Sequence, residues 1–207
     1  MNYAHLLCLS LYMKHLFIVI ISFVMLSATE AVAQYWHSPK REYRAVWVTT
    51  IENLDWPKTK IKSPADIEKQ KGEFTRLLDS LALYNINTIL LQTRVRGDVI
   101  YPSTIEPFSP VLTGKAGKNP GYDPLAFALE EAHKRGMELH VWVNPFRAST
   151  GSLSSSDVLW SNAGDWLIKY NNTGSFTGYL IDPGYPESRA YVVKVMMEIV
   201  NKYDVDG

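Results

Sequence analysis

Three short runs rich in β-branched and aromatic residues alternate along the chain with three longer segments in which apolar residues recur every three or four positions. The runs predict strands at 44–50, 88–94 and 138–144. The longer segments predict helices that begin at Pro64, Pro124 and Pro186, because proline is favoured in the first turn of a helix. Strands that alternate with helices in this way indicate βα units built around a parallel sheet.

The connections between these elements differ in length. Each helix leads into the next strand within two or three residues, whereas the links from strand to helix are long, at 51–62, 95–122 and 145–185. The long links therefore all leave the carboxyl ends of the strands, where both a (β/α)8 barrel and a doubly wound sheet place their active sites. The first strand lacks the glycine-rich turn of a dinucleotide site, which favours the barrel.

Alternate residues of a strand point to opposite faces of its sheet, and this sorts the strand residues into two sets. One set is apolar and is expected to pack on the helices: Val46, Val48, Ile89, Leu91, Leu139, Val141 and Val143. The other set is expected to face the barrel interior and turns polar toward the carboxyl ends: Ala45, Trp47, Thr49, Leu90, Gln92, Arg94, His140, Trp142 and Asn144. Polar side chains converging beside two tryptophans are typical of a substrate site.

The same residues could instead have structural roles. Arg94 could pair with an acid such as Asp98, and Asn144 could bond to loop backbone. Trp47 and Trp142 could form a sugar-binding platform or fill the barrel. His140 is deeper in its strand and is interpreted as a core histidine.

Charge and composition limit the kinds of partner, disulfide and metal site that the chain can have. The 21 basic and 21 acidic residues cancel, so nothing indicates nucleic acid as a partner. The single cysteine, Cys8, excludes an internal disulfide framework and a cysteine-based zinc site. We expect no metal and no cofactor, since His140 is the one histidine on a predicted strand.

The first 33 residues have the pattern of a secretory signal peptide. Lys14 precedes an apolar run at 16–26, and Ala31-Val32-Ala33 offers small residues for cleavage before Gln34. The run is shorter than the roughly 20 residues that span a bilayer, so no transmembrane segment is expected in the mature chain. We expect an exported protein, periplasmic or extracellular, with a short linker at 34–42 before the domain at 43–207.

The length limits how much of a barrel the chain can hold. A (β/α)8 barrel takes about 250 residues, and the predicted strands and helices use the whole mature chain, with 204–207 leading into a fourth strand. The expected fold is therefore α/β: the N-terminal part of a (β/α)8 TIM barrel, about three βα units plus the lead-in to strand four, truncated at the C-terminus.

A series of motifs in one order resembles a known family. They are RAVW at 44–47, LDWP at 54–57, QTRVRGD at 92–98, LTG at 112–114, PGYDPL at 120–125, EAHKRG at 131–136, WVNPFR at 142–147, DPG at 182–184 and YDVDG at 203–207. Over about residues 42–207 the chain resembles the bacterial glycosyl-hydrolase-like family 10, a (β/α)8-barrel family distantly similar to amylase-type glycosidases. The resemblance implies an exported enzyme acting on polysaccharide, with bacterial cell-wall glycan a candidate.

The resemblance also implies which residues line the substrate site. Together with Trp142 from the strand pattern, they are Trp47, Gln92, Arg94, Asp98, Asn144 and Arg147. Glycosidases need two carboxylates beside the scissile bond, and the resemblance places the first a few residues after YDVDG. The catalytic residues are thus expected beyond Gly207. A glycan-binding barrel without catalysis is the main alternative, and an unrelated metal-dependent barrel lyase is disfavoured by the lone strand histidine.

Overall fold

The computed structural model describes residues 13–16, 42–150, 164–171 and 177–207. The chain divides into the units Met1–Glu42 and Tyr43–Gly207. In the first unit residues 13–16 are helical, while the predicted cleavage position and most of the linker at 34–42 lie outside the described residues. None of the helices in the described ranges is long and apolar enough to cross a bilayer.

The second unit is built on a parallel sheet of β1 (Ala45–Val48), β2 (Thr88–Arg96) and β4 (Glu138–Val143), with β2 in the middle. Segment 206–207 continues this sheet beyond β4. The Asp206 amide donates to the Leu139 carbonyl at 3.1 Å, and the Val141 amide donates to the Gly207 carbonyl at 2.8 Å. Each parallel strand thus lies beside the one before it. In a doubly wound sheet the order reverses and a later strand returns to the first, so the order observed here is that of a (β/α)8 barrel.

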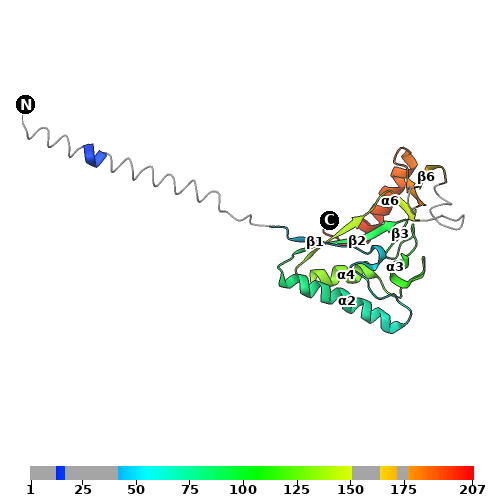
Figure 1. The fold of residues 1–207 in the computed structure, drawn as a ribbon, viewed down its shortest axis with the longest axis horizontal. Helices are drawn as coiled ribbons and strands as arrows, with labels where there is room; N and C mark the ends of the chain where they lie inside the picture. Colours follow the sequence, from blue (N-terminus) through cyan, green and yellow to red (C-terminus); the bar gives the residue numbers. More distant parts are fainter. Residues whose placement is uncertain (1–12, 17–41, 151–163, 172–176) are drawn as a thin grey trace, which may run out of the picture. The chain divides into compact units, whose positions relative to one another are not determined.

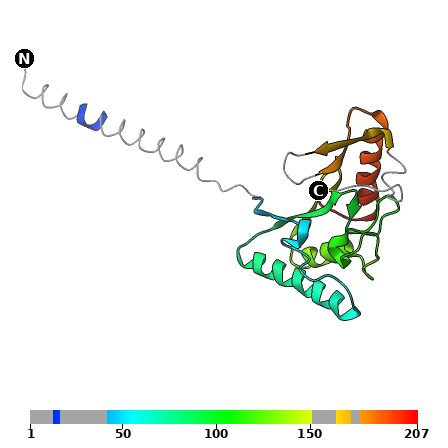
Figure 2. The same ribbon diagram turned by 45° about the vertical axis from the view of Figure 1, so that its right-hand side comes forward.

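Three helices follow the parallel strands: α2 (Pro64–Leu83), α4 (Pro124–His133) and α6 (Pro186–Lys202). All three begin with proline in the first turn, as predicted. Ser63 and Asp66 form a capping box at the start of α2, and the Asp123 side chain accepts from the Leu125 and Ala126 amides at the start of α4. Helices α2 and α4 lie side by side along one face of the parallel sheet (Figure 1, Figure 2).

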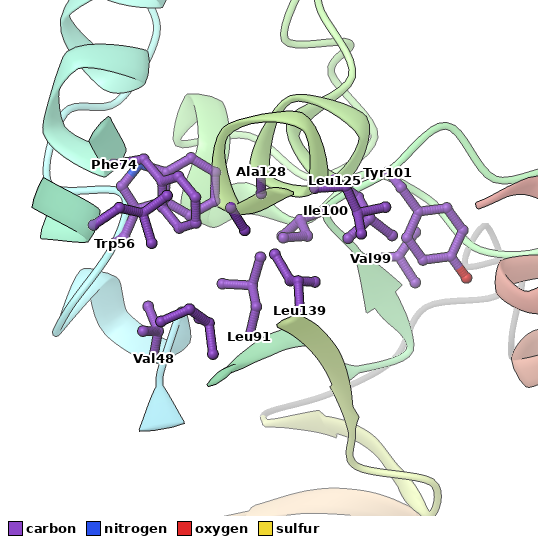
Figure 3. Close-up of a cluster of buried hydrophobic side chains, with 14 of the residues drawn as sticks. Val48, Trp56, Phe74, Leu91, Val99, Ile100, Tyr101, Leu125, Ala128 and Leu139 are labelled. Atoms are coloured by element: carbon purple, nitrogen blue, oxygen red, sulfur yellow. The ribbon is translucent and has the colours of Figure 1, made fainter. Parts of the chain in front are cut away.

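The main core lies between this sheet face and the helices, as the alternation of the strands predicts (Figure 3). The buried strand residues include Val48, Ile89, Leu91 and Leu139, and the helical ones include Phe74, Leu78, Leu125 and Ala128. The inward side of α6 runs through Val192, Val195 and Ile199, and Met196 lies at its margin with 37% of its surface exposed.

The long links contain secondary structure that the sequence analysis did not predict. The first holds the short 3-10 helix η1 (Ile51–Asn53), and the second holds β3 (Asp98–Val99), which forms a hairpin with β2, and the four-residue helix α3 (Pro110–Thr113). The third holds η2 (Gly164–Trp166) and a three-stranded antiparallel sheet in the order β5 (Arg147–Thr150), β7 (Thr177–Ile181), β6 (Leu167–Asn171). These additions stand at the carboxyl ends of the parallel strands and build up that rim.

Candidate functional site

Trp47 and Trp142 form an aromatic pair on the sheet face opposite α2 and α4. Trp47 comes from β1 and Trp142 from β4, and their ring centroids lie 4.8 Å apart at an interplanar angle of 89°. Trp47 is 59% exposed. The Trp142 indole Nε1 donates to Asn144 Oδ1 at 2.9 Å, which fixes the orientation of that ring. The pair therefore places two aromatic rings in a fixed mutual orientation on this face of the sheet.

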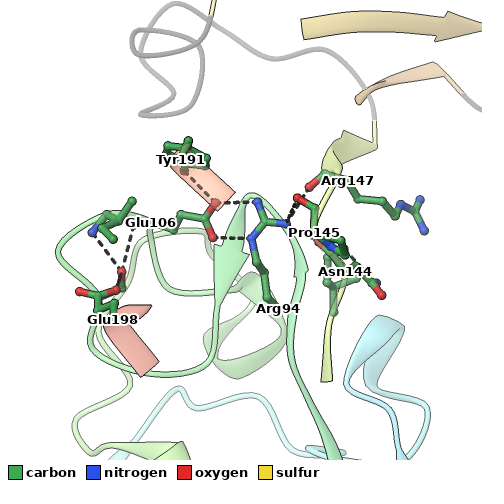
Figure 4. Close-up of polar contacts among 10 residues, drawn as sticks. Arg94, Glu106, Asn144, Pro145, Arg147, Tyr191 and Glu198 are labelled. Carbon is green, nitrogen blue, oxygen red and sulfur yellow. Dashed lines mark hydrogen bonds and ion pairs between the residues drawn. The ribbon is translucent and has the colours of Figure 1, made fainter. Parts of the chain in front are cut away.

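A cavity of about 370 Å³ adjoins Asn144 and is lined further by Pro145, Phe146, Arg147 and Leu180. Asn144 is fastened from two sides, since its Nδ2 donates to the Val95 carbonyl at 3.2 Å and its Oδ1 accepts from Trp142. The Arg147 guanidinium points away from Arg94 (Figure 4). Within the described part of the chain this guanidinium makes no hydrogen bond or ion pair.

Arg94, expected at the substrate rim, is only 1% exposed. Its Nε and Nη2 donate to Glu106 Oε2 and Oε1 at 2.7 and 2.6 Å. Its Nη1 donates to three backbone carbonyls of the loop after β4, those of Asn144, Pro145 and Arg147 (Figure 4). This geometry leaves Arg94 holding the loop that presents Asn144 and Arg147. The acid that pairs with it is Glu106, where the sequence had suggested Asp98.

Glu106 also ties this network to the third helix. The Tyr191 hydroxyl on α6 donates to Glu106 Oε1 at 2.8 Å. Burial alone would lower the pKa of Arg94, but the hydrogen bonds and charge of Glu106 outweigh it and raise that pKa. Burial, and then the charge of Glu106, raise the pKa of Tyr191. Arg94 therefore stays charged and Tyr191 stays neutral, which suits a structural support under the site.

The sequence analysis missed Glu106 and Tyr191. Glu106 lies in the irregular link after β3, where no periodicity assigns a side chain to a face. Tyr191 lies on α6, where its place in the apolar stripe indicates burial but no partner.

Gln92 and Asp98 are not part of the tryptophan pair. Gln92 is 2% exposed, and its Oε1 accepts from the Thr49 hydroxyl at 2.7 Å and from the Thr50 and Ile51 amides at 3.0 Å each. It thereby anchors the start of the loop after β1. Asp98 lies on the β3 hairpin, where burial raises the pKa of its carboxyl and Oδ1 has no hydrogen-bond partner.

The structure thus separates the predicted site residues into two layers. Trp47 is exposed and Trp142, Asn144 and Arg147 are partly exposed, while Gln92 and Arg94 are buried and hold the loops. His140 bonds through Nε2 to Glu138 at 3.1 Å, but its side chain is 28% exposed, so it is not the core histidine that the sequence suggested. In the described ranges no three histidine, cysteine or acidic residues gather where a metal ion would bind.

Comparison with known proteins places this geometry in context. Residues 42–207 match the family described as Glycosyl hydrolase-like 10. The chain is 39% identical over 171 residues to glycosyl hydrolase YngK of Bacillus subtilis (strain 168), covering 81% of this chain and 32% of YngK. It is 35% identical over 175 residues to glycosyl hydrolase DigH of Escherichia coli (strain K12), covering 79% of this chain and 40% of DigH. The chain therefore spans about a third of the length of one relative and two fifths of the other.

Among solved structures, the chain is similar to the maltogenic alpha-amylase AmyB from Thermotoga neapolitana, with 16% identity over 80% of this chain and 38% of that one and a TM-score of 0.48. It is also similar to the alpha-galactosidase TtGalA from Thermus thermophilus, with 14% identity over 79% of this chain and 31% of that one and a TM-score of 0.45. Likenesses at this level are too weak to carry an inference about the site.

Proposed function

This chain belongs to the glycosyl hydrolase-like 10 family, and on that premise we propose that the whole protein is a glycoside hydrolase acting on polysaccharide. The observation that carries the proposal is the Trp47–Trp142 pair, held by Asn144 beside a cavity that Arg147 helps to line. An exposed aromatic face stacks on a sugar ring, and the neighbouring amide and guanidinium supply groups that bond to hydroxyls.

Bacterial cell-wall glycan is the proposed substrate. The signal-peptide pattern at residues 1–33 supports export, and an exported bacterial protein reaches this glycan without crossing a further barrier. The basic and acidic residues of the chain balance, so its charge gives no reason to propose a nucleic acid as the substrate instead of a glycan.

We place the two catalytic carboxylates on later strands of the barrel. Of the acids near the rim described above, Glu106 is bound by Arg94 and Tyr191, and Asp98 is buried on the β3 hairpin. Glycoside hydrolysis needs one carboxyl group as acid and a second as base or nucleophile, on opposite sides of the bond. The residues of this chain would accordingly bind and orient the glycan.

The experiment compares the whole protein with its Trp47→Ala variant on purified cell-wall glycan, measuring bound glycan and released reducing ends. Loss of one stacking contact is worth about 1 kcal/mol, so we expect KM to rise roughly fivefold. The matched control is Tyr84→Ala, which removes a 77% exposed aromatic ring at the far end of α2 and should change neither measurement.

Unchanged binding and turnover in Trp47→Ala would contradict the placement of the site. A whole protein that binds glycan, weakens with Trp47→Ala and yet releases no reducing ends would be the alternative from the sequence, a glycan-binding barrel without catalysis.

A further inference from the structure

A second cavity, of about 170 Å³, lies between the loop after β1 and the loop after β2. This is the space of about five water molecules. Its lining brings together three charged side chains: Glu52 next to Asn53 in η1, Lys60 further along the same loop, and Arg96 at the end of β2. The cavity therefore stands at the carboxyl-end rim of the parallel strands, where the proposed function also lies.

These three charged side chains do not pair with one another. In the described ranges neither Glu52, Lys60 nor Arg96 forms a side-chain hydrogen bond or an ion pair within 4.0 Å. The Arg96 Nε is buried and has no hydrogen-bond partner. A buried donor without a partner costs free energy. Two cations and one anion line the cavity.

Asp98, opposite Arg96 in the pairing of β2 with β3, is the further acid that acts on Arg96. Burial is the main influence on Asp98 and raises the pKa of its carboxyl, whereas the Arg96 charge acts to lower it. Asp98 Oδ1 has no hydrogen-bond partner. Arg96 Nε likewise has no hydrogen-bond partner, so it remains a donor for a group in the adjoining cavity.

The backbone around the cavity is held in place without a ligand. The Asn53 side chain donates from Nδ2 to the Val111 carbonyl at 2.8 Å and to the Pro57 carbonyl, which ties the two loops together. Glu52 and Asn53 both have left-handed backbone conformations, with φ of 52° and 58°. Such conformations are unfavourable for glutamate and gather at ligand sites.

We propose that this cavity is a subsite for a sugar residue that carries a carboxylate. Arg96 and Lys60 donate to the carboxylate, and Glu52 accepts from a hydroxyl or amide N–H of the same or the next sugar. The inference rests on the proposed function and deepens it, because it makes the substrate an anionic polysaccharide. The subsite is separate from the Trp47–Trp142 pair, which binds by stacking and takes no account of charge.

The test uses the whole protein and one cell-wall glycan in two forms, with its carboxyl groups free and with the same groups converted to neutral amides. The unmodified protein should bind the free-acid form at least tenfold more tightly, because a hydrogen bond between two charged groups is among the strong ones. Lys60→Gln should abolish this preference and leave affinity for the amidated form unchanged. Arg96→Gln should do the same.

The control is Lys194→Gln on α6, which removes the same charge from an exposed helix position and should keep the full preference. Lys60 is exposed, so its variant should fold even if loss of the partly buried Arg96 disturbs the hairpin. Equal binding of both glycan forms by the unmodified protein, or an undiminished preference in Lys60→Gln, overturns the subsite and leaves the proposed function standing. Failure of the unmodified protein to bind either form contradicts both.

Discussion

Arg94 shows how far a single residue can be interpreted from sequence. Strand alternation correctly assigns it to the face opposite the helices, but alternation gives the direction of a side chain and not its depth. The loops after β2 and β4 close over it, so its guanidinium bonds to Glu106 and to loop carbonyls. Since those loops are irregular, neither the burial of Arg94 nor the identity of its partner could be predicted.

Replacing Arg94 with methionine should destabilise the whole protein by about 3–5 kcal/mol, because it leaves the buried Glu106 carboxylate without its partner. Denaturant melts measure this loss. The double variant Arg94→Met with Glu106→Leu should recover part of the stability, since it removes both buried charges together.

The control for this pair is Lys134→Met. Lys134 forms exposed ion pairs with Glu130 and Glu131 on the surface of α4, so its variant should melt like the unmodified protein. A single Arg94→Met variant of unaltered stability would show that the buried pair does not support the loop after β4.

Among the elements, those with strong local signals were predicted and those without were not. Helices α2 and α4 have capping side chains, an initial proline and a continuous apolar stripe, and all three signals lie within each helix. Strands β5, β6 and β7 have four or five residues each, and they pair with one another across segments distant in sequence. Their pattern is too short to distinguish a strand from a loop.

One contact between elements should make the stability depend on acid. Glu198 on α6 accepts from the Thr104 amide at 2.8 Å, from the side chains of Ser103 and Thr104, and from Lys202. Burial opposes its ionisation, but these hydrogen bonds outweigh burial and lower the pKa of Glu198 to about 2. The ionised carboxylate thus joins α6 to the link after β3.

Because the pKa of Glu198 is lower in the folded state than its ordinary value of 4.5, the stabilisation is complete above pH 4.5 and is lost as the pH falls toward about 2. Glu198→Gln should be less stable at neutral pH and should lose less stability on acidification. Urea melts over this pH range measure both effects. Glu187→Gln, in the exposed first turn of the same helix, should keep the acid dependence of the unmodified protein; a Glu198→Gln variant that also kept it would contradict the assignment.

At the scale of the whole molecule, the alternation of strands and helices predicts a parallel sheet, and segment 206–207 beside β4 gives this sheet the strand order of a barrel. The layered arrangement of the barrel interior explains the tryptophan contact. In such barrels a layer of inward side chains comes from alternate strands, and Trp47 and Trp142 come from the first and third parallel strands. Sequence predicts both residues as inward-facing, but their contact follows only from the register between strands.

Export is also a property of the whole chain. If Ala31-Val32-Ala33 directs cleavage, the exported protein should begin at Gln34, and N-terminal sequencing of exported material checks this. Ala33→Arg should leave the segment attached, because the cleavage site requires a small residue there, whereas Gln34→Arg should still be processed. A mature N-terminus far from Gln34 would rule out the predicted cleavage site.

The hydrogen bond from Trp142 to Asn144 has a consequence for the thermodynamics of recognition. A free tryptophan side chain would lose rotational freedom when a ligand settles on it, and that loss of about 0.5–1.5 kcal/mol would weaken binding. Here the ring is immobilised during folding, by Asn144 on one side and by the edge contact with Trp47 on the other. The entropic cost of ordering the ring falls on the stability of the protein, so an arriving ligand meets a surface that is already ordered.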